Sequence, residues 1–334
     1  MKVTISDIAK AANVSRSTVS NALNNKPGVS SHNKAKIKRI AENLGYKSID
    51  KNINLILKLL VVNKNANIIG DTPFFSELIK GIESECMKNN FSLMISHLNL
   101  DETINLNQTL ENLTKNVSGV MVLATELNYD DIEKFNAIEV PYVFLDCNFN
   151  NQKYDFISIN NFDSAYDITK YIISRGHKNI GIINSPHNIK NFSDRKEGFL
   201  KCLKDNNLQF KRENEILCEA MIKDSYNAMK EYLENNSSNN SSIPTAFFAV
   251  NDNVASGAMK AFSENKLKIS IAGFDNLPIS TLLTYPLTTV DVNKNLLGSI
   301  SVKRLIDRIN DKSDSRLRIL MSSKIIERQS VFEI

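Results

Sequence analysis

Several signatures of enzymes and membrane proteins are missing from this 334-residue sequence. It contains no glycine-rich phosphate-binding loop, no serine on a strand-to-helix turn and no histidine pair at metal-ligand spacing. We therefore expect no cofactor and no metal ion, and an enzyme acting on a small polar substrate is kept only as a remote alternative. No apolar run is long enough to span a membrane as a helix, which argues against an integral membrane protein.

Cysteine is also scarce. The four cysteines are scattered, with neither metal-ligand spacing nor a disulfide context: Cys86, Cys147, Cys202 and Cys218. Met1–Thr4 leads directly into a polar helix pattern, without the apolar segment of a signal peptide. These features argue against a secreted solute-binding protein and predict reduced thiols in a cytoplasmic protein.

The start of the chain predicts two short helices separated by a tight corner. Thr4 and Ser15 each stand where a side-chain oxygen caps a helix, and Asp7 follows Thr4 at nearly the spacing of a capping box. Residues 11–14 are small and include Asn13, which tolerates the left-handed backbone of a corner. This pattern predicts a helix-turn-helix, so DNA is the first partner to consider.

A third helix is expected after residues 26–30, where Ser30 or Ser31 can act as the cap and Gly45 ends the pattern. Its apolar positions recur at helical spacing: Ile37, Ile40, Ala41 and Leu44. The first two helices supply the rest of a small common core: Ile5, Ile8, Ala9, Ala12, Val14, Val19, Ala22 and Leu23. The sequence thus predicts an all-α head over residues 1–46.

The second helix has a polar face opposite its apolar residues. That face carries Arg16, Ser17, Ser20 and Asn21. Arg16 lies in the first turn, where a recognition helix presents side chains to base edges, and its guanidinium group suits guanine. Asn21 is expected to reach adenine or a phosphate.

Charge is distributed unevenly along the chain. Residues 1–60 contain eleven Lys or Arg and three Asp or Glu, a net charge of +8, whereas the whole chain is +4, so the other 274 residues total −4. A basic head on a slightly acidic body is the electrostatic pattern of an attached DNA-binding module, because neutralising phosphates supplies most of the non-specific affinity.

This head resembles the N-terminal module of the lac-repressor (LacI/GalR) family of bacterial transcription regulators. The resemblance rests on the pattern Ile5-x-Asp7-Ile8-Ala9-x-x-Ala12-x-Val14-Ser15-x-x-Thr18-Val19-Ser20-x-x-Leu23-Asn24, followed by Val29-Ser30 and Leu44-Gly45-Tyr46. It implies that Arg16, Ser17 and Asn21 select the operator sequence, while Thr18 and Ser20 touch the DNA backbone. The full set of expected DNA contacts is Thr4, Ser15, Arg16, Ser17, Thr18, Ser20, Asn21, Asn24, Ser30 and Leu55.

The rest of the chain alternates between short apolar strands and helices. Predicted strands cover Leu55–Val62, Ser92–His97, Gly119–Ala124, Tyr142–Asp146, Phe156–Ile159, Asn179–Asn184, Thr245–Asn251 and Ile269–Phe274. Predicted helices cover residues 74–90, 102–115, 130–136, 163–175, 193–206, 224–234 and 253–264. The alternation predicts doubly wound parallel sheets, and the length suffices for two lobes of roughly 130 residues each.

Polar residues that follow the predicted strands are candidates for ligand binding, because ligands of open parallel sheets bind beyond the carboxyl ends of the strands. Asp146, Asn251 and Asp275 occupy such positions, and Arg195 lies in the first turn of a helix that Ser193 can cap. Carboxylates and amides facing an arginine suit a polyhydroxylated or anionic small molecule, with aromatic rings as flat apolar surfaces. The expected binding set is Phe74, Phe75, Asp146, Asn191, Arg195, Tyr226, Asn251 and Asp275.

The family resemblance extends over this body. It rests on the motifs Pro73-Phe74-Phe75-x-Glu77-Leu78-Ile79-x-Gly81-Ile82-Glu83, Arg175-Gly176-His177-x-x-Ile180-Gly181, Arg195-x-x-Gly198-Phe199, Asn251-Asp252-x-x-Ala255-x-Gly257-Ala258 and Ala272-Gly273-Phe274-Asp275. It implies a two-lobed sensor, similar to periplasmic sugar-binding proteins, that closes on an effector, and a structural role for His177. We expect a sugar or sugar derivative as the effector; a nucleobase stacked on Phe75 and a phosphoprotein co-regulator remain alternatives.

One segment departs from the family pattern. Members carry Pro-Asn and then Ala-Arg-x-Leu in a hinge helix whose leucine wedges into the minor groove, whereas residues 47–57 here read Lys-Ser-Ile-Asp-Lys-Asn-Ile-Asn-Leu-Ile-Leu. Leu55 has the wedge spacing, but Leu55–Val62 reads better as a strand, which leaves about eight residues, roughly two helical turns, for a hinge. We expect an atypical hinge at 47–54 and a polar loop at Asn63–Thr72 that shapes effector entry.

The predicted organisation is a helix-turn-helix head (1–46), a linker (47–54) and an effector-binding and dimerisation domain (55–334). Within the last, the N-lobe is expected at about 55–158 and 287–318, and the C-lobe at about 159–286 and 319–334. One recognition helix contacts too few base pairs for useful specificity, so a homodimer on two-fold-related half-sites is expected. Residues 327–334 show no heptad pattern, so no coiled-coil tetramer is expected. The protein is predicted to be a transcription regulator that acts as a repressor and whose operator affinity is controlled by an effector.

Overall fold

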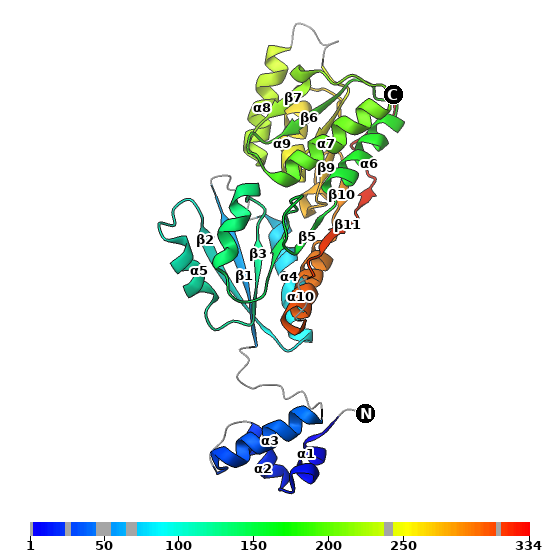
Figure 1. The fold of residues 1–334 in the computed structure, drawn as a ribbon. Coiled ribbons are helices and arrows are strands. Elements are labelled where there is room, and N and C mark those ends of the chain that lie inside the picture. The colour runs from blue at the N-terminus through cyan, green and yellow to red at the C-terminus, as the bar shows by residue number, and fades with distance from the viewer. Residues whose placement is uncertain (1–2, 24–27, 45–54, 65–71, 237–242, 312–314) are drawn as a thin grey trace. The chain divides into compact units, whose positions relative to one another are not determined.

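The computed structural model describes residues 3–23, 28–44, 55–64, 72–236, 243–311 and 315–334. The chain divides into two compact units, a small helical head (Met1–Leu55) and a larger α/β body (Ile56–Ile334) (Figure 1). Within the described ranges no helix combines the length and the apolar character needed to cross a membrane.

Three helices form the head: α1 Ile5–Ala12, α2 Arg16–Leu23 and α3 Ser31–Asn43. Thr4 and Asp7 make the capping box of α1, in which the Thr4 amide donates to the Asp7 carboxylate at 2.8 Å. Ser15 Oγ accepts from the Thr18 amide at 3.0 Å, and Ser30 Oγ accepts from the Asn33 amide at 3.3 Å. The predicted caps are therefore confirmed.

The corner and the core of the head also follow the prediction. Asn13 has φ 52° and ψ 49°, in the left-handed region. The buried core comprises Ile8, Ala9, Ala12, Val19, Ala22, Ile37 and Ala41, with Ile5, Val14, Leu23 and Ile40 partly buried around it. Leu44 is exposed instead, and Asn24 and Gly45 lie outside the described residues. A core this small leaves most of the head surface to polar side chains.

The body contains two six-stranded sheets, each the centre of one lobe. The N-lobe sheet has the order β11-β5-β4-β3-β1-β2 and is wholly parallel, and the C-lobe sheet has the order β12-β10-β9-β8-β6-β7 with only β12 antiparallel. The N-lobe strands are β1 Ile56–Asn63, β2 Ser92–Asn99, β3 Gly119–Leu123, β4 Tyr142–Leu145, β5 Phe156–Ile159 and β11 Arg318–Met321. The C-lobe strands are β6 Ile180–Asn184, β7 Glu215–Leu217, β8 Ala246–Ala249, β9 Ser270–Phe274, β10 Thr288–Asp291 and β12 Lys324–Ile326.

Helices cover both sheets. The N-lobe has α4 Pro73–Lys88, α5 Leu106–Thr114, the 3₁₀ segment η1 Tyr129–Ala137 and α10 Lys294–Asn310. The C-lobe has α6 Asn161–Ser174, α7 Lys190–Asp205, α8 Ile222–Asn235 and α9 Asp252–Glu264, with the short 3₁₀ turns η2 Arg212–Asn214 and η4 Pro278–Thr281. The predicted alternation is confirmed, but β7, β10, β11, β12 and α10 are additional to the predicted elements.

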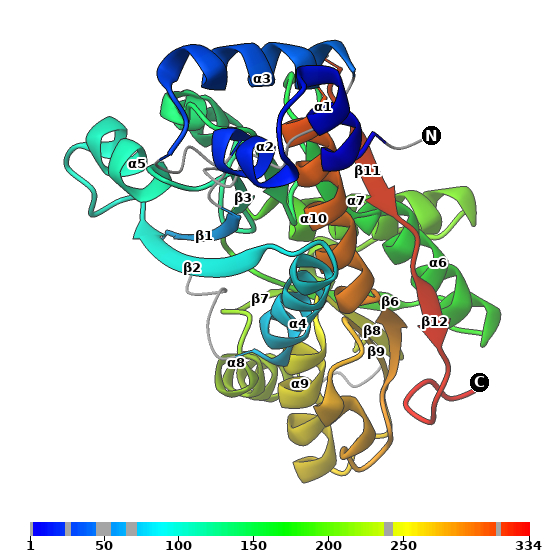
Figure 2. The ribbon, with the colours of Figure 1, turned by 90° about the horizontal axis from the view of Figure 1, so that it is seen from below.

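Central strands are buried on both faces, as parallel sheets covered by helices require. All six inner residues of β1 are buried, including Lys58, whose ammonium group donates to the Leu113 carbonyl at the end of α5. On the other face, α4 packs against α10 (Figure 2), and a Cβ atom at Gly81 would overlap the Asn295 carbonyl. Glycine therefore sets how closely these two helices approach.

The described body passes between lobes three times: from β5 to α6, from β10 to α10, and from β11 to β12, where the red strands run on from one lobe to the other in Figure 2. The predicted lobe boundaries are therefore wrong in two places. Residues 288–291 pair with β9 in the C-lobe sheet, and residues 318–321 pair with β5 in the N-lobe sheet. Strand pairing between distant segments decides this membership, and chain order does not reveal it.

Candidate functional site

The N-terminal end of α2 presents a polar surface in the head. Arg16 and Ser17 lie in the first turn with exposed side chains. The Ser15 hydroxyl group lies 2.7 Å from that of Ser17 and 2.8 Å from that of Thr18. Arg16 makes no hydrogen bond or ion pair within the described part of the chain. Its charge is available to an external anion.

The other predicted DNA contacts comprise exposed helix caps and half-buried side chains. Thr4 and Ser30 act as helix caps, and Ser20 and Asn21 are half-buried on α2. Leu55 lies directly before β1 and is 41% exposed. Asn24 and the expected hinge at 47–54 lie outside the described residues, so those predictions stay open.

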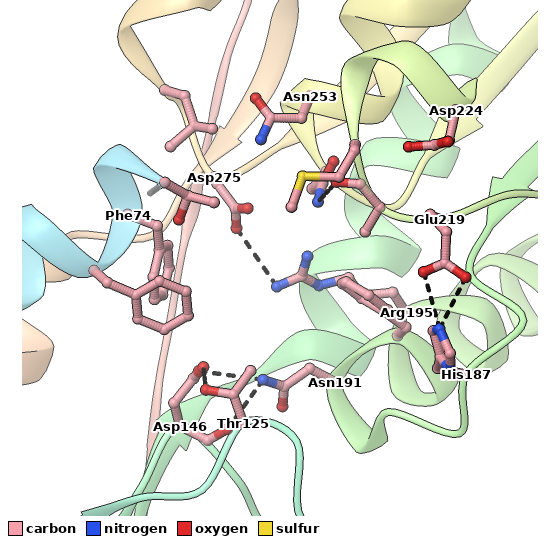
Figure 3. A pocket seen from close by; sticks show the side chains of 17 residues that line it. Phe74, Thr125, Asp146, His187, Asn191, Arg195, Glu219, Asp224, Asn253 and Asp275 are labelled. Atoms are coloured by element: carbon pink, nitrogen blue, oxygen red, sulfur yellow. Dashed lines mark hydrogen bonds and ion pairs between the residues drawn. The ribbon is translucent and has the colours of Figure 1, made fainter. Parts of the chain in front are cut away.

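In the body, a cavity of about 330 Å³ lies at the carboxyl ends of strands from both sheets (Figure 3). Seven of the eight predicted residues line it: Phe74, Phe75, Asp146, Asn191, Arg195, Asn251 and Asp275. The structure adds Thr72, Thr125, His187, Phe192, Glu219, Ala220, Met221, Asp224, Asn253 and Leu277. The N-lobe supplies an aromatic wall, in which the rings of Phe74 and Phe75 meet edge to face at 5.1 Å, and the C-lobe supplies most polar groups.

Arg195 is the buried cation of the cavity, with 4% of its surface exposed. Its Nε donates to Asn161 Oδ1 at 2.8 Å and its Nη1 to the Val250 carbonyl at 2.5 Å, while the guanidinium group lies 3.6 Å from the ring centroid of Phe274. Nη2 lies 3.5 Å from Asp275 Oδ1 (Figure 3). Helix α7 begins at Lys190, so the predicted start at Ser193 is wrong, and Arg195 occupies the second turn.

Asp275 follows β9 with φ 102°, a left-handed conformation that costs a non-glycine residue roughly 1 kcal/mol or more. Its carbonyl accepts from Lys294 Nζ at 2.5 Å, and Lys294, 3% exposed at the start of α10, also lies 3.4 Å from Glu77 of α4. Burial raises the pKa of Asp275, although Arg195 and Lys294 oppose the shift. Its buried Oδ1 accepts no hydrogen bond within the described chain. That oxygen is available to a donor on a ligand.

Asp146 directly follows β4 and connects the two lobes through hydrogen bonds. Asn191 Nδ2, on α7 of the C-lobe, donates to the Asp146 carbonyl at 3.0 Å and to its Oδ1 at 3.2 Å. Thr125 Oγ1 donates to the Asp146 Oδ2 at 2.7 Å. Burial raises the pKa of Asp146 to about 6, with the hydrogen bond from Thr125 and the charge of Arg195 opposing the shift. Together with the Lys294–Asp275 bond, this contact holds one lobe against the other.

Behind the cavity, Asp252 supports the loop that carries Asp275. Its carboxylate accepts from the Leu277 amide at 2.7 Å and from the hydroxyl groups of Ser280 and Thr289 at 2.6 Å each. Burial raises the pKa of Asp252 to about 7. The neighbouring Asn251 lines the cavity, yet its Oδ1 also caps α9 by accepting an amide at 2.8 Å. Asn251 and Asp252 therefore stabilise the fold independently of any ligand contact.

The cavity wall also contains a histidine–glutamate contact, and a carboxylate without a partner in the described chain, that the predicted set lacks. His187 Nε2 lies 2.9 and 3.0 Å from the two Glu219 carboxylate oxygens. Asp224 makes no hydrogen bond or ion pair with the described chain. His187 follows β6 and Glu219 follows β7. Strand β7 is only three residues long, which is too short to be recognised from the sequence. A predicted strand there would have made Glu219 a candidate, because ligands bind beyond the carboxyl ends of parallel strands.

Tyr226 is misplaced by the prediction. It lies on α8 but does not line the cavity; its hydroxyl group donates to Glu264 on α9 at 2.6 Å, and Lys260 lies 4.6 Å from its ring centroid. The helical phase of α8 directs Asp224 to the cavity and Tyr226 to α9.

Among the described residues no group of three or more His, Cys, Asp or Glu could hold a metal ion.

Comparison with known proteins gives a consistent result for both units. Residues 4–48 match the model of bacterial regulatory proteins, lacI family, and residues 169–331 match a periplasmic binding protein-like domain. The chain is 31% identical to the HTH-type transcriptional repressor PurR of Pasteurella multocida over 98% of each chain.

Solved structures share the fold over the same length. One is a complex of the transcriptional regulator CelR with cellobiose, at 21% identity, a TM-score of 0.73 and coverage of 98% of this chain and 100% of that chain. Another is a lac repressor dimer bound to operator and the anti-inducer ONPF, at 23% identity, a TM-score of 0.72 and coverage of 99% and 100%. At these identities the likeness concerns the fold alone.

Proposed function

Because this chain belongs to the lacI family and is a DNA-binding transcriptional repressor, we propose that a small molecule bound between its lobes controls its affinity for an operator. The observation that supports this most directly is the cavity at the carboxyl ends of both sheets, where Arg195 and Asp275 are buried side by side. Buried charged groups with fixed positions can recognise a polar ligand through oriented hydrogen bonds.

On the DNA side, the proposal assigns base contacts to Arg16, Ser17 and Asn21. Backbone contacts are assigned to Thr4, Ser15, Thr18, Ser20, Asn24 and Ser30, and a minor-groove contact to Leu55. The exposed Arg16 at the start of α2 supports this, because the first turn of a recognition helix meets the base edges. The cytoplasm, where the operator DNA lies, is the proposed location of the repressor.

The repressor is proposed to act as a homodimer on two-fold-related half-sites. The edge strand β2 exposes Met94 and Ile95, and the adjoining helix α4 exposes Met87. Exposed apolar side chains along the edge of a lobe are typical of a surface that another chain covers. Analytical ultracentrifugation tests this, because a Met94→Lys variant is expected to shift the dimer toward monomer.

For the effector, a sugar-like molecule is the first candidate. The oxygen acceptors of Asp146 and Asp275 suit hydroxyl groups, and the rings of Phe74 and Phe75 suit the apolar face of a pyranose or furanose. A nucleobase is the second candidate, because the same rings offer a stacking surface. Binding would change operator affinity only if the effector favours one arrangement of the lobes. The Asp146–Asn191 and Asp275–Lys294 bonds are the contacts that such a preference would alter.

The operator half of the proposal is tested by fluorescence anisotropy with DNA from upstream of the gene, at two salt concentrations. Tight binding that weakens with salt is expected, since phosphate contacts release counterions. Binding no stronger than to random DNA would refute sequence-specific recognition.

The effector half is tested by calorimetry and the same operator titration. Neutral sugars and nucleobases are compared on the parent protein and on an Arg195→Leu variant. We expect one class to bind and to change operator affinity in the parent only. Binding that persists unchanged in the variant would place the site elsewhere.

A further inference from the structure

The wall of the cavity carries more negative than positive charge. Among the described residues that line it, four have carboxyl groups: Asp146, Glu219, Asp224 and Asp275. Against them stand Arg195 and, when protonated, His187. The wall is therefore negative by two or three charges once its carboxyl groups are ionised.

Arg195 offers little to an anionic ligand. Two of its three nitrogens donate to Asn161 and to the Val250 carbonyl, and the third faces Asp275. One face of the guanidinium group is covered by the ring of Phe274. The charge of Arg195 already faces the Asp275 carboxylate, so a phosphate or carboxylate on the ligand would have to compete with Asp275 for it.

Two carboxyl groups of the wall accept no hydrogen bond from the described chain, although Asp275 Oδ1 lies 3.5 Å from Arg195 Nη2. Asp275 is 8% exposed, and its Oδ1 accepts no hydrogen bond although the atom is buried, which is unusual for a charged oxygen. Asp224 lies on the other side of the cavity, in the first turn of α8, and its carboxylate makes no hydrogen bond or ion pair with the described chain (Figure 3). The helix dipole of α8 favours a carboxylate there but supplies no counter-charge inside the cavity.

We propose that the effector is an amine-bearing polyhydroxylated molecule, such as an amino sugar, whose ammonium group binds beside Asp224 while its hydroxyl groups donate to Asp275. The inference rests on the proposed effector site. Closing the lobes on a neutral ligand would remove the Asp224 carboxylate from water without a counter-charge, which is costly, whereas an ammonium group supplies both the counter-charge and three donors. A phosphate or carboxylate on the ligand would meet the same carboxylates and be rejected.

The test is calorimetry with matched ligands on the full-length repressor. Glucose, galactose and mannose are each compared as the neutral sugar, the 2-amino sugar and the 6-phosphate. For the preferred ring, the amino form is expected to bind at least about tenfold more tightly than the neutral form, with no binding of the phosphate. Equal or tighter binding of a neutral or phosphorylated form overturns the proposal, and so does a panel in which no amino sugar binds.

Two variants separate recognition of the amine from a structural effect. Asp224→Asn is expected to reduce the amino-to-neutral affinity ratio to near one, because the amino sugar loses its carboxylate partner while the neutral sugar loses none. Glu231→Gln, which removes an exposed carboxylate from the same helix, should leave the ratio unchanged. An unchanged ratio in Asp224→Asn overturns the assignment. A neutral sugar or nucleobase that binds and alters operator affinity would sustain the effector site and refute only the amine.

Discussion

The head and the cavity of the body differ in how far their candidate recognition residues are buried and paired. In the head, the principal candidate Arg16 is exposed and unpaired within the described chain, and the core beneath it consists of apolar side chains alone. In the cavity of the body, Arg195, Asp146 and Asp275 are all more than nine-tenths buried, and each has polar partners among buried side chains or backbone groups. The difference implies that recognition and stability are separable in the head and inseparable in the cavity.

The largest effect that would test this contrast is expected from Arg195→Leu. The substitution removes the buried cation beside Asp275 and Asp146, and it leaves the Asn161 amide oxygen and the Val250 carbonyl without their donor. We therefore expect the free energy of unfolding to fall by about 3 kcal/mol. Urea denaturation of the body measures it, alongside loss of effector binding. A variant that loses effector binding at full stability would show that recognition in the cavity is separable after all.

Arg16→Ala should have the second largest effect, confined to DNA binding. Loss of a base contact weakens operator binding by about 1–3 kcal/mol, and the free energy of unfolding should not change because the side chain is exposed. Anisotropy and urea denaturation measure the two quantities. Lys223→Ala, which removes the same charge from the body, is the control and should leave operator affinity as it is.

Lowering the pH should increase the contribution of buried carboxyl groups to the stability of the body and decrease that of Asp7 to the stability of the head. Burial raises the pKa of Asp146 to about 6 and that of Asp252 to about 7, above the unfolded value near 3.8. The folded body therefore binds these protons more tightly, and their contribution to its stability increases as pH falls from about 7 toward 4. In the head, hydrogen bonds from Thr4 lower the pKa of Asp7, so its contribution is lost as pH falls through that lowered value.

Unfolding measured from pH 8 to pH 5 tests the body half of this expectation. Asp252→Asn should flatten the pH dependence, because a side chain that titrates between those limits is removed. An unchanged slope would mean that Asp252 does not titrate in this range. Asp146→Asn is the matched comparison and should flatten the lower part of the same range.

The smallest effect is expected from Thr4→Ala. Loss of a capping box costs about 1 kcal/mol of local helix stability, since the orphan amides of the first turn lose their acceptor. Amide hydrogen exchange in α1 should accelerate, with no change in the body. Ser6→Ala in the same helix, which removes no cap, should leave exchange rates nearly unchanged.

Predictions from the sequence succeeded where the cause was local. Caps at Thr4, Ser15 and Ser30 depend on residues three positions apart, and the strand-end positions of Asp146 and Asp275 depend on the apolar run that precedes each. Tyr226 failed because the phase of α8, set by packing against α9, turns it away from the cavity. Glu219 was missed because β7 is too short to be recognised as a strand, and His187 was missed because it lies three residues beyond the predicted strand Asn179–Asn184.

The sequence by itself determined the helix-turn-helix head, the alternation of strand and helix, the family and most residues at the strand ends, because each depends on near neighbours in the chain. Only the tertiary structure decided which lobe β10 and β11 join, since that depends on pairing with distant strands. It alone also brought Lys294 to the Asp275 carbonyl and Asp224 into the wall opposite it. The charge balance of the cavity arises from segments far apart in the chain, and only their approach through packing defines it.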